Sequence, residues 1–541
     1  MNIINDPWLF VEYLDGTTTQ VSVRQAFTDA EQIRKFVTPC FHKTVMYAYD
    51  IPVIQLFVTI LQAAYYKPEY DFIAKDEFFS KNLMTNGWDD KVLFGYLDKW
   101  SCRFNLFDEK YPFLQDVTLQ PTGSEGHDYL TTVNPFAPCA NNVFFGKIRS
   151  VCKDRNDPMA FYEMDETELA YHLLFENVFG HSPCGAQYPH KAVSFKAGLN
   201  IIPEGKNIRE TIIFNCLPLE KSSRPVDEYE SDIMYDRPVW ELNSQSEILN
   251  YDMANVCKNK LLCTFFPGFH IRAFKEGDKI VEIVLGRDIK ESVFNKEDMD
   301  SLRENYVIHN PWAIYATKED KKTKEKTFLY KQWYPTIKLM SLCLEITSNL
   351  PDSISCNIVD QELQKNHGAT CLIYFREMDD KFANVLSCGR YEVRQEVFDK
   401  LQDEQNHEKA SQVCKRMDAV LSTMRSTVSR INKYSASIER NSKTLISKES
   451  FRRIETQFVD KVVHYFFNEF IDNIEKEDIT TESFKKIHAW AKELMETLAD
   501  SCKADFIEVQ NQLSLFSYSL YKLDEKAKKQ YNKETGGNES D

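Results

Sequence analysis

Lysine and arginine residues gather in one segment near the end of the chain, between residues 408 and 455. The segment holds eleven Lys or Arg against five Asp or Glu, a local net charge of +6 in a chain whose formal net charge is −16. Ser and Thr lie among the basic residues, as on protein faces that contact phosphates. We therefore predict a face that binds a nucleic-acid backbone, with an ordinary solvated helix face as the alternative. The predicted DNA-backbone residues are Lys415, Arg416, Arg425, Arg430, Lys433, Arg440, Lys443, Arg452 and Arg453.

Signatures of metal binding and of catalysis are weak by comparison. His181, Cys184 and His190 could be drawn as metal ligands, as could a second group within 257–270, but neither spacing matches a common site. No CxxC, HExxH, GxSxG or GxxxxGK[ST] motif occurs. No spacing of carboxylates selects an acid/base pair. The sequence therefore predicts a protein that is not an enzyme and that uses no metal and no cofactor.

The composition is that of a large globular protein. The chain has 541 residues, of which 43% are hydrophobic and 27% charged, so it can bury a large core without disulfides. A pI of about 5.3 argues against a protein that coats nucleic acid with its whole surface, but it allows a local basic groove. The fourteen cysteines are scattered, and no signal peptide or membrane-spanning segment is evident. These features predict a cytoplasmic protein with reduced thiols that does not contact membranes.

The elements that must position the basic residues are helices. Residues 391–525 contain no proline, and apolar residues such as Val413, Met417 and Val420 recur at helical spacing. Long amphipathic segments with short polar breaks between them predict an antiparallel four-helix bundle. The last residues, 526–541, are predicted to form a polar tail.

The first 390 residues show a mixed pattern. Alternating residues on both sides of Asp15–Gly16 predict an opening β-hairpin. Helices are predicted at Val53–Tyr65, Lys91–Phe104 and Glu166–Phe179. Short β-like runs lie at Thr211–Leu217, Phe269–Phe274, Lys279–Leu285, Trp312–Thr317, Thr327–Tyr330 and Thr370–Phe375. The predicted fold class is α+β: a large mixed domain with small sheets and helices at 1–390, followed by the helical bundle.

Eight short segments together resemble one known family. They are NDPWLFV at 5–11, RFNLFDEKYPFLQ at 103–115, ELAYHLLFENVFG at 168–180, SFKAGL at 194–199, NIRETIIFNCLPL at 207–219, RPVWE at 237–241, HNPWAIY at 309–315 and QWYP at 332–335. Their order and spacing resemble the large subunit of the type I-E CRISPR surveillance complex, the CasA subunit of Cascade. In physical terms, the aromatic residues of these segments, such as Phe104 and Trp240, predict core packing, and Arg103 is predicted to pair with Asp108.

The resemblance implies a non-catalytic recognition subunit. Such a subunit reads a short protospacer-adjacent motif on double-stranded DNA, helps to open the duplex for guide RNA pairing, and recruits an effector helicase–nuclease. The implied partners are the other Cascade subunits, the CRISPR RNA and the target DNA. Two alternatives stay open: a scaffold with only nonspecific DNA contacts, and a metal-dependent nuclease.

Three loops correspond to functional positions of the family. The first is implied to lie near the 5′ end of the guide RNA and comprises Asn141, Asn142, Val143, Phe144 and Phe145. The second corresponds to a glycine-rich DNA-contacting loop and contains His190, Lys191, Ser194 and Lys196. The third corresponds to a hairpin that wedges beneath the first base pair and contains Gln364, Asn366, His367, Gly368 and Ala369.

The DNA-contacting loop differs from the family pattern, and the family's minor-groove lysine has more than one counterpart in this sequence. The DNA-contacting loop lacks glycines before Gly198, which makes close approach of its backbone to a minor groove harder. The letters of the adjacent motif therefore cannot be inferred from the family. Lys296 corresponds to a minor-groove lysine of the family, with Lys275 and Lys279 as alternatives.

Overall fold

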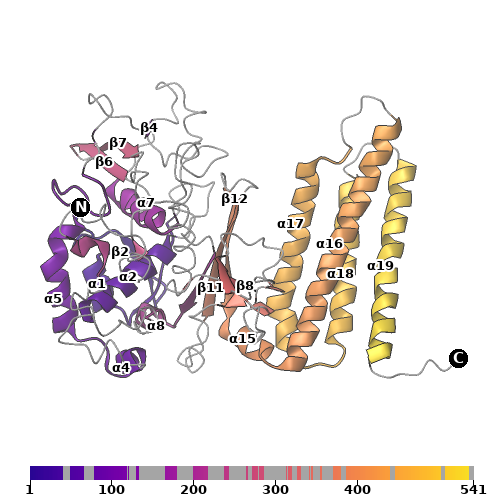
Figure 1. The fold of residues 1–541 in the computed structure, drawn as a ribbon, viewed down its shortest axis with the longest axis horizontal. Helices are drawn as coiled ribbons and strands as arrows, with labels where there is room; N and C mark the ends of the chain where they lie inside the picture. The colour runs from indigo at the N-terminus through magenta and orange to yellow at the C-terminus, as the bar shows by residue number, and fades with distance from the viewer. Residues whose placement is uncertain are drawn as a thin grey trace. The chain divides into compact units, whose positions relative to one another are not determined.

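The computed structural model divides the chain into two compact units (Figure 1). The first unit contains Met1–Pro335 and Leu350–Gln395, and the second contains Thr336–Asn349 and Glu396–Asp541. The structure describes residues 1–39, 49–65, 78–117, 120, 130–132, 165–179, 199–216, 237–242, 264–265, 271–277, 279–285, 312, 315–319, 326–330, 340–341, 343–344, 354–355, 370–378, 385–438, 445–500 and 506–534.

The first unit opens with the predicted hairpin. Strand β1 (Leu9–Tyr13) pairs antiparallel with β2 (Thr18–Val21) and with β3 (Ile33–Phe36), in the order β2-β1-β3. Gly16 in the connecting turn has a φ of 85°, a conformation that costs glycine little. Helix α1 (Val23–Thr28) follows β2.

The helices of the first unit surround a large apolar core. They are α2 (Asp50–Tyr65), α4 (Phe78–Asn86), α5 (Asp90–Trp100), the 3-10 turn η2 (Ser101–Phe104), α7 (Glu166–Phe179), α8 (Ile208–Phe214) and the 3-10 turn η5 (Val239–Glu241). Every residue of α2 is buried, as expected of a helix that is apolar on nearly all sides. The three predicted helices of this region are confirmed, and α7 has the predicted bounds.

The strand predicted at Thr211–Leu217 is wrong, because α8 occupies most of this segment. Asn207 is the N-cap, and its Oδ1 accepts a hydrogen bond from the backbone N–H of Glu210 at 2.9 Å. The Glu210 carboxylate in turn accepts from the N–H of Lys206 at 2.9 Å. This capping arrangement supplies partners for the first turn of the helix and overrides the β-preference of the Thr-Ile-Ile run.

Three further small sheets belong to the first unit. Their strands are β4 (Leu130–Thr132), β5 (Leu199–Glu204), β6 (Ile271–Glu276), β7 (Lys279–Leu285), β8 (Tyr315–Glu319), β9 (Lys326–Tyr330), β10 (Ile354–Ser355), β11 (Thr370–Met378) and β12 (Val385–Arg394). The sheet orders are β4-β7-β6, β10-β8-β9 and β12-β11-β5, and in these sheets the neighbouring strands pair antiparallel. The β-like runs other than 211–217 therefore overlap strands, whereas β3, β4, β5, β10 and β12 were not predicted.

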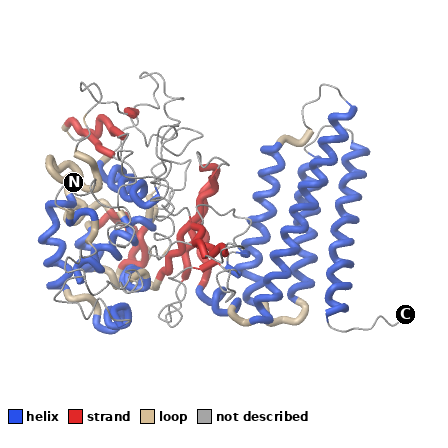
Figure 2. The backbone as a smooth tube through the Cα atoms, in the orientation of Figure 1, coloured by secondary structure: helices blue, strands red, loops and turns tan. Residues whose placement is uncertain are grey.

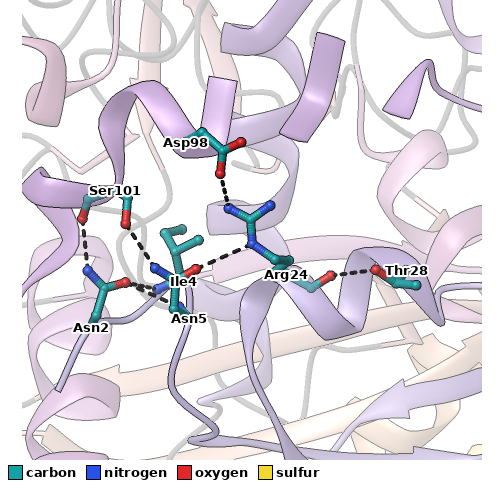
Figure 3. Close-up of polar contacts among 7 residues, drawn as sticks. All are labelled: Asn2, Ile4, Asn5, Arg24, Thr28, Asp98 and Ser101. Carbon is teal, nitrogen blue, oxygen red and sulfur yellow. Dashed lines mark hydrogen bonds and ion pairs between the residues drawn. The ribbon is translucent and has the colours of Figure 1, made fainter. Parts of the chain in front are cut away.

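Side-chain amides tie Asn2 and Asn5, the first residue of the NDPW motif, to Ser101 of η2 (Figure 3). Asn2 donates from Nδ2 to the carbonyl of Ser101 at 2.9 Å, and Asn5 donates to the Ser101 hydroxyl at 2.9 Å. Arg24 donates to Oδ1 of Asn5 at 3.3 Å and forms an ion pair with Asp98. These contacts fix the start of the chain against an element about 100 residues further along.

The RFNLFDEKYPFLQ and RPVWE motifs meet in one aromatic cluster. The ring of Trp240 lies 5.0 Å from that of Phe104 and 6.4 Å from that of Phe113. Trp240 donates from Nε1 to the Tyr96 hydroxyl at 2.9 Å, and this hydroxyl donates to Glu241 at 2.6 Å. The predicted packing role of these aromatic residues is confirmed, since Phe104, Phe113 and Trp240 are all buried.

The predicted pair between Arg103 and Asp108 is wrong. The Arg103 guanidinium lies over the ring of Tyr111, 3.4 Å from its centroid. Oδ1 of Asp108 instead accepts from the backbone N–H groups of Lys110 and Tyr111. The short side chain of Asp108 thus closes a local turn. The backbone N–H groups of that turn are within its reach more readily than the Arg103 guanidinium.

The second unit consists chiefly of helices packed side by side (Figure 2). Helix α15 (Gln395–Leu401) leads into four long helices, α16 (Glu404–Ile438), α17 (Lys448–Tyr465), α18 (Ile479–Asp500) and α19 (Phe506–Glu534). A π-helical turn, η8 (Phe466–Phe470), and a 3-10 turn, η9 (Ile471–Asn473), join α17 to α18. The predicted α+β fold class is confirmed.

The core of the second unit follows the predicted apolar pattern. Val413, Met417 and Val420 are buried on α16, and Phe458 and Val462 are buried on α17. Helix α19 continues to Glu534, beyond residue 526 where the polar tail was predicted to begin. Among the described residues, no helix is both long and apolar enough to cross a membrane.

Candidate nucleic-acid interface

A group of exposed basic residues lies at one end of the α16–α17 pair in the second unit. We call this region the basic end and define it as residues 425–438 and 445–455, the C-terminal part of α16 and the start of α17. It contains six basic residues against two acidic ones, Glu449 and Glu455. The six are Arg425, Arg430, Lys433, Lys448, Arg452 and Arg453, and all are exposed. The result is a local charge of +4 on a surface open to solvent.

Most of these charges are not neutralised by nearby carboxylates. Within the described residues, Lys433, Lys448 and Arg453 take part in no ion pair. The Arg430 guanidinium donates to the hydroxyl of Thr427 at 3.1 Å, a neutral partner one turn earlier. Charges without carboxylate partners attract a polyanion, because no internal salt bridge must be broken before it binds.

Arg425 is the exception within the basic end. Its Nε donates to Oε1 of Glu455 on α17 at 2.7 Å, and the same guanidinium forms an ion pair with that carboxylate. The Arg425 side chain is nevertheless 55% exposed, so part of the guanidinium still faces solvent. This pair links α16 to α17 while Glu455 cancels one positive charge.

Side-chain caps hold the start of α17 in place. Ser447 is the N-cap, and its Oγ accepts from the N–H of Ser450 at 3.0 Å. Asn432 on α16 forms two hydrogen bonds with the backbone of Ile446, the residue before the cap. Ile446 is buried. The two helix ends are therefore connected by specific contacts as well as by the chain.

Arg416 does not belong to this surface, contrary to the sequence-based prediction. Only 6% of its side chain is exposed, and Nη1 donates to Oδ1 of Asp524 at 2.7 Å. The guanidinium also lies 4.0 Å from the ring centroid of Phe484 and donates to the carbonyl of Leu523 at 3.2 Å. Burial lowers the pKa of Arg416, and the Asp524 carboxylate opposes that shift. Arg416 therefore joins α16 to α19 inside the bundle.

Other basic residues near the start of α16 differ in their surroundings. Lys415 is exposed beside the buried Arg416. Lys409 donates from Nζ to the carbonyls of Ile474 at 2.8 Å and Lys476 at 3.1 Å. Those carbonyls follow η9, where a helical segment ends and leaves acceptors without intrahelical partners. Lys409 is thus one of the basic residues counted in the net charge of +6 between residues 408 and 455, but its amino group caps the carbonyls that follow η9.

The opposite end of α17 is acidic. Residues 469–482 carry six acidic residues and one lysine. This segment includes η9 and the start of α18, so the length of α17 separates it from the basic end. A nucleic acid would therefore be attracted to one end of the helices and repelled from the other.

Several predicted site residues lie outside the described residues. They are Asn141, Asn142, Val143, Phe144, Phe145, His190, Lys191, Ser194, Lys196, Lys296, Gln364, Asn366, His367, Gly368, Ala369, Arg440 and Lys443. The possible metal ligands His181, Cys184 and His190, and the second group of Cys257, Cys263 and His270, also lie there. In the part of the chain that is described, no three His, Cys, Asp or Glu side chains group as metal ligands would.

Lys275, one alternative to Lys296, is engaged in local contacts. Its Nζ lies 2.9 Å from Oε1 of Glu166 and 4.7 Å from the ring centroid of Phe107. The amino group of Met1 pairs with the same carboxylate. These partners make Lys275 a link between β6 and the start of α7. Lys279 begins β7.

Sequence reasoning missed Asn432 and Glu455. Both lie within the basic segment, but neither is basic, and a search for phosphate-binding charge passes over them. A polar residue on the interior side of an amphipathic helix, such as Asn432 one position after the buried Ile431, was the available signal.

A family model described as CRISPR-associated protein Cse1 matches residues 2–335. No curated protein matches the sequence. Among solved structures, Cse1 of Thermobifida fusca is similar with a TM-score of 0.65 at 16% identity, covering 96% of this chain and 97% of that one. CasA (Cse1) of Thermus thermophilus is similar with a TM-score of 0.63 at 15% identity, covering 96% and 98%. A chain of a CRISPR RNA-guided surveillance complex has a TM-score of 0.63 at 12% identity, covering 96% and 99%.

Proposed function

The chain belongs to the CRISPR-associated Cse1 family, and we propose on this basis that it acts as the large subunit of a type I-E CRISPR RNA-guided surveillance complex. In this role it holds target DNA through the basic end of α16 and α17. The observation that carries the proposal is the group of exposed basic residues there, among which Lys433, Lys448 and Arg453 have no ion pair within the described residues. Contacts of this kind give affinity without sequence readout.

We assign motif reading and duplex opening to other segments of the same chain. The loop containing His190, Lys191, Ser194 and Lys196 is proposed to contact the protospacer-adjacent motif, and Lys296 the minor groove. The turn at 364–369 is proposed to separate the first base pair. Family resemblance and the polar, basic character of these segments support this assignment. Protein reads the short motif while guide RNA pairing reads the remaining sequence.

The proposed role requires no catalytic group. The subunit binds, bends or opens DNA and then presents it to the guide RNA and to a helicase–nuclease that performs cleavage. Other Cascade subunits and the CRISPR RNA are the proposed partners, and the loop at 141–145 is proposed to meet them near the guide 5′ end. Similarity to a chain of a surveillance complex supports these partners.

Binding to a randomised duplex library tests the proposal. The guide-loaded complex, assembled with and without this chain, is incubated at one salt concentration with duplexes randomised beside a fixed target. We expect enrichment of a short flanking motif only when the chain is present. The same enrichment without the chain would contradict motif reading and leave a scaffold role.

Variants in the turn at 364–369 separate duplex opening from initial binding. Asn366→Ala and His367→Ala are expected to slow opening of a matched duplex while leaving binding to a pre-opened target unchanged. Equal losses on both targets would contradict the wedge assignment.

A cleavage assay tests the alternative that the chain is a metal-dependent nuclease. The purified chain is incubated with DNA and magnesium, and a nuclease would release cleaved product without any partner protein.

A further inference from the structure

Asn432 belongs to the α16 half of the basic end, and its side chain binds the backbone of the α17 half. Its side-chain Nδ2 donates to the carbonyl oxygen of Ile446 at 3.0 Å. Its Oδ1 accepts from the backbone N–H of the same residue at 2.9 Å. One amide on α16 therefore satisfies both backbone polar groups of a residue 14 positions further along the chain.

These two hydrogen bonds lie where the backbone needs them. Ile446 directly precedes the N-cap Ser447, so helix α17 supplies neither partner. Ile446 is only 3% exposed, which leaves little room for water to replace the amide. A buried backbone group without a partner is unfavourable, because it has lost its hydrogen bonds to water and gained none in return. The Asn432 amide is thus a strong determinant of where α17 begins relative to α16.

Basic residues stand on both sides of this contact. Arg430 and Lys433 flank Asn432 on α16, whereas Lys448 and Arg452 follow Ile446 on α17. Helix ends fray readily when they are not tied down. Deeper in the pair, the ion pair of Arg425 with Glu455 connects the same two helices. The Asn432 contact therefore ties the start of α17 to the part of α16 that carries Arg430 and Lys433.

We propose that Asn432 is a positioning residue that makes the two halves of the basic end one surface for a nucleic-acid backbone. The inference rests on the proposed function and adds a specific residue to it. Charges held at a fixed spacing bind one polyanion together, and binding does not have to order them first. Without the amide, the α16 and α17 charges bind independently, and fewer of them engage the same DNA segment.

The test compares Asn432→Ala with Asn468→Ala in the full chain. Asn468 is an exposed asparagine of η8, the turn after α17, and its Nδ2 contacts His464 one turn earlier, at the carbonyl and at Nδ1 of the ring. Affinity for a duplex of about 40 base pairs is measured from about 50 to 200 mM salt, the range over which phosphate contacts dominate. We expect Asn432→Ala to weaken binding about five- to tenfold and to lower the salt slope by about 1–2, at about 0.9 per lost phosphate contact. Asn468→Ala is expected to change neither.

A double-mutant cycle provides a readout that a purely structural role would not change. The changes in DNA-binding free energy caused by Lys433→Ala, by Arg452→Ala and by both together are compared in the wild-type and Asn432→Ala backgrounds. Coupling between the two positions is expected in the wild type and is expected to vanish without the amide. Asn432→Ser retains one hydrogen-bonding group and is expected to give intermediate affinity and coupling, which covers the case where Asn432→Ala folds poorly.

The outcomes separate this inference from the proposed function. If alanine at Arg430, Lys433, Arg452 and Arg453 leaves affinity and salt slope unchanged, the basic end does not bind DNA. If those variants lose binding while Asn432→Ala and Asn432→Ser keep wild-type affinity, slope and coupling, only the positioning role is overturned.

Discussion

The guanidinium of Arg416 on α16 lies 2.7 Å from the carboxylate of Asp524 on α19. The ring of His488 on α18 touches both groups, with Nε2 at 3.3 Å from Nη1 of Arg416 and Nδ1 at 3.3 Å from Oδ2 of Asp524. An arginine can only donate, so the neutral ring accepts at Nε2 and carries its proton on Nδ1, from which it donates to Asp524. Three helices of the second unit therefore meet in one charged cluster.

Removal of the Arg416 side chain is expected to destabilise the second unit. Arg416→Ala leaves Nε2 of His488 without its donor and the Asp524 carboxylate without its positive partner, so we expect a loss of about 2–3 kcal/mol in the free energy of unfolding. Urea unfolding, combined with hydrogen exchange of the α19 amides, measures this loss. The neighbouring exposed Lys415→Ala is the control and is expected to stay within about 0.5 kcal/mol of wild type. Equal stability of the two variants would contradict the cluster.

Protonation of His488 is expected to weaken the same cluster at low pH. Burial lowers the pKa of His488 below its ordinary 6.5, and Arg416 and Lys492 add to this effect against the opposing charge of Asp524. The unfolded state therefore binds the proton more readily than the folded state. The contribution of neutral His488 to stability is fully present above about pH 6.5 and is lost as the pH falls through the folded-state pKa. His488→Gln keeps one donor and one acceptor, and its stability is expected to vary less over this window. The measurement is urea unfolding at a series of pH values.

Alanine at the unpaired charges of the basic end is expected to reduce DNA binding regardless of sequence. Each of Lys433→Ala and Arg453→Ala removes one phosphate contact, so the salt slope should fall by about 0.9 per variant. Lys461→Ala, on the same helix as Arg453, is a matched control, because Lys461 pairs with Glu493 at 3.1 Å. Fluorescence anisotropy with two unrelated duplexes measures the effect. A loss confined to one duplex would indicate base reading instead.

The hydroxyl of Tyr96 is expected to stabilise the first unit. It accepts from Trp240 and donates to Glu241, and burial together with Glu241 raises the pKa of Tyr96 well above its usual range. Tyr96→Phe leaves the buried Trp240 N–H without this acceptor, so we expect the free energy of unfolding to fall by about 1–3 kcal/mol. Thermal unfolding of the full chain measures it. Tyr521→Phe, which removes an exposed hydroxyl, is expected to have almost no effect, and a similar loss in both variants would argue against the network.

Local patterns in the sequence were sufficient for much of the architecture. The helical spacing of Val413, Met417 and Val420 predicted the long α16, because the 3.6-residue period is a property of the segment itself. The bounds of α7 followed from its own apolar stripe. At Thr211, a β-branched run misled the prediction, since the capping residues Asn207 and Glu210 decided the local structure.

The sequence by itself determined that the segment between residues 408 and 455 is basic and helical, but only the tertiary structure decided which of its charges face solvent. Arg416 and Arg430 are the same residue type on one helix, yet the first is buried against Asp524, 108 residues further along the chain, and the second is exposed. Asn432 acquires its role in the same way, from a backbone 14 residues away across a helix end. Periodicity and charge are local and can be read along the chain. Burial and pairing depend on which distant segments the fold brings together, and no spacing in the sequence specifies that.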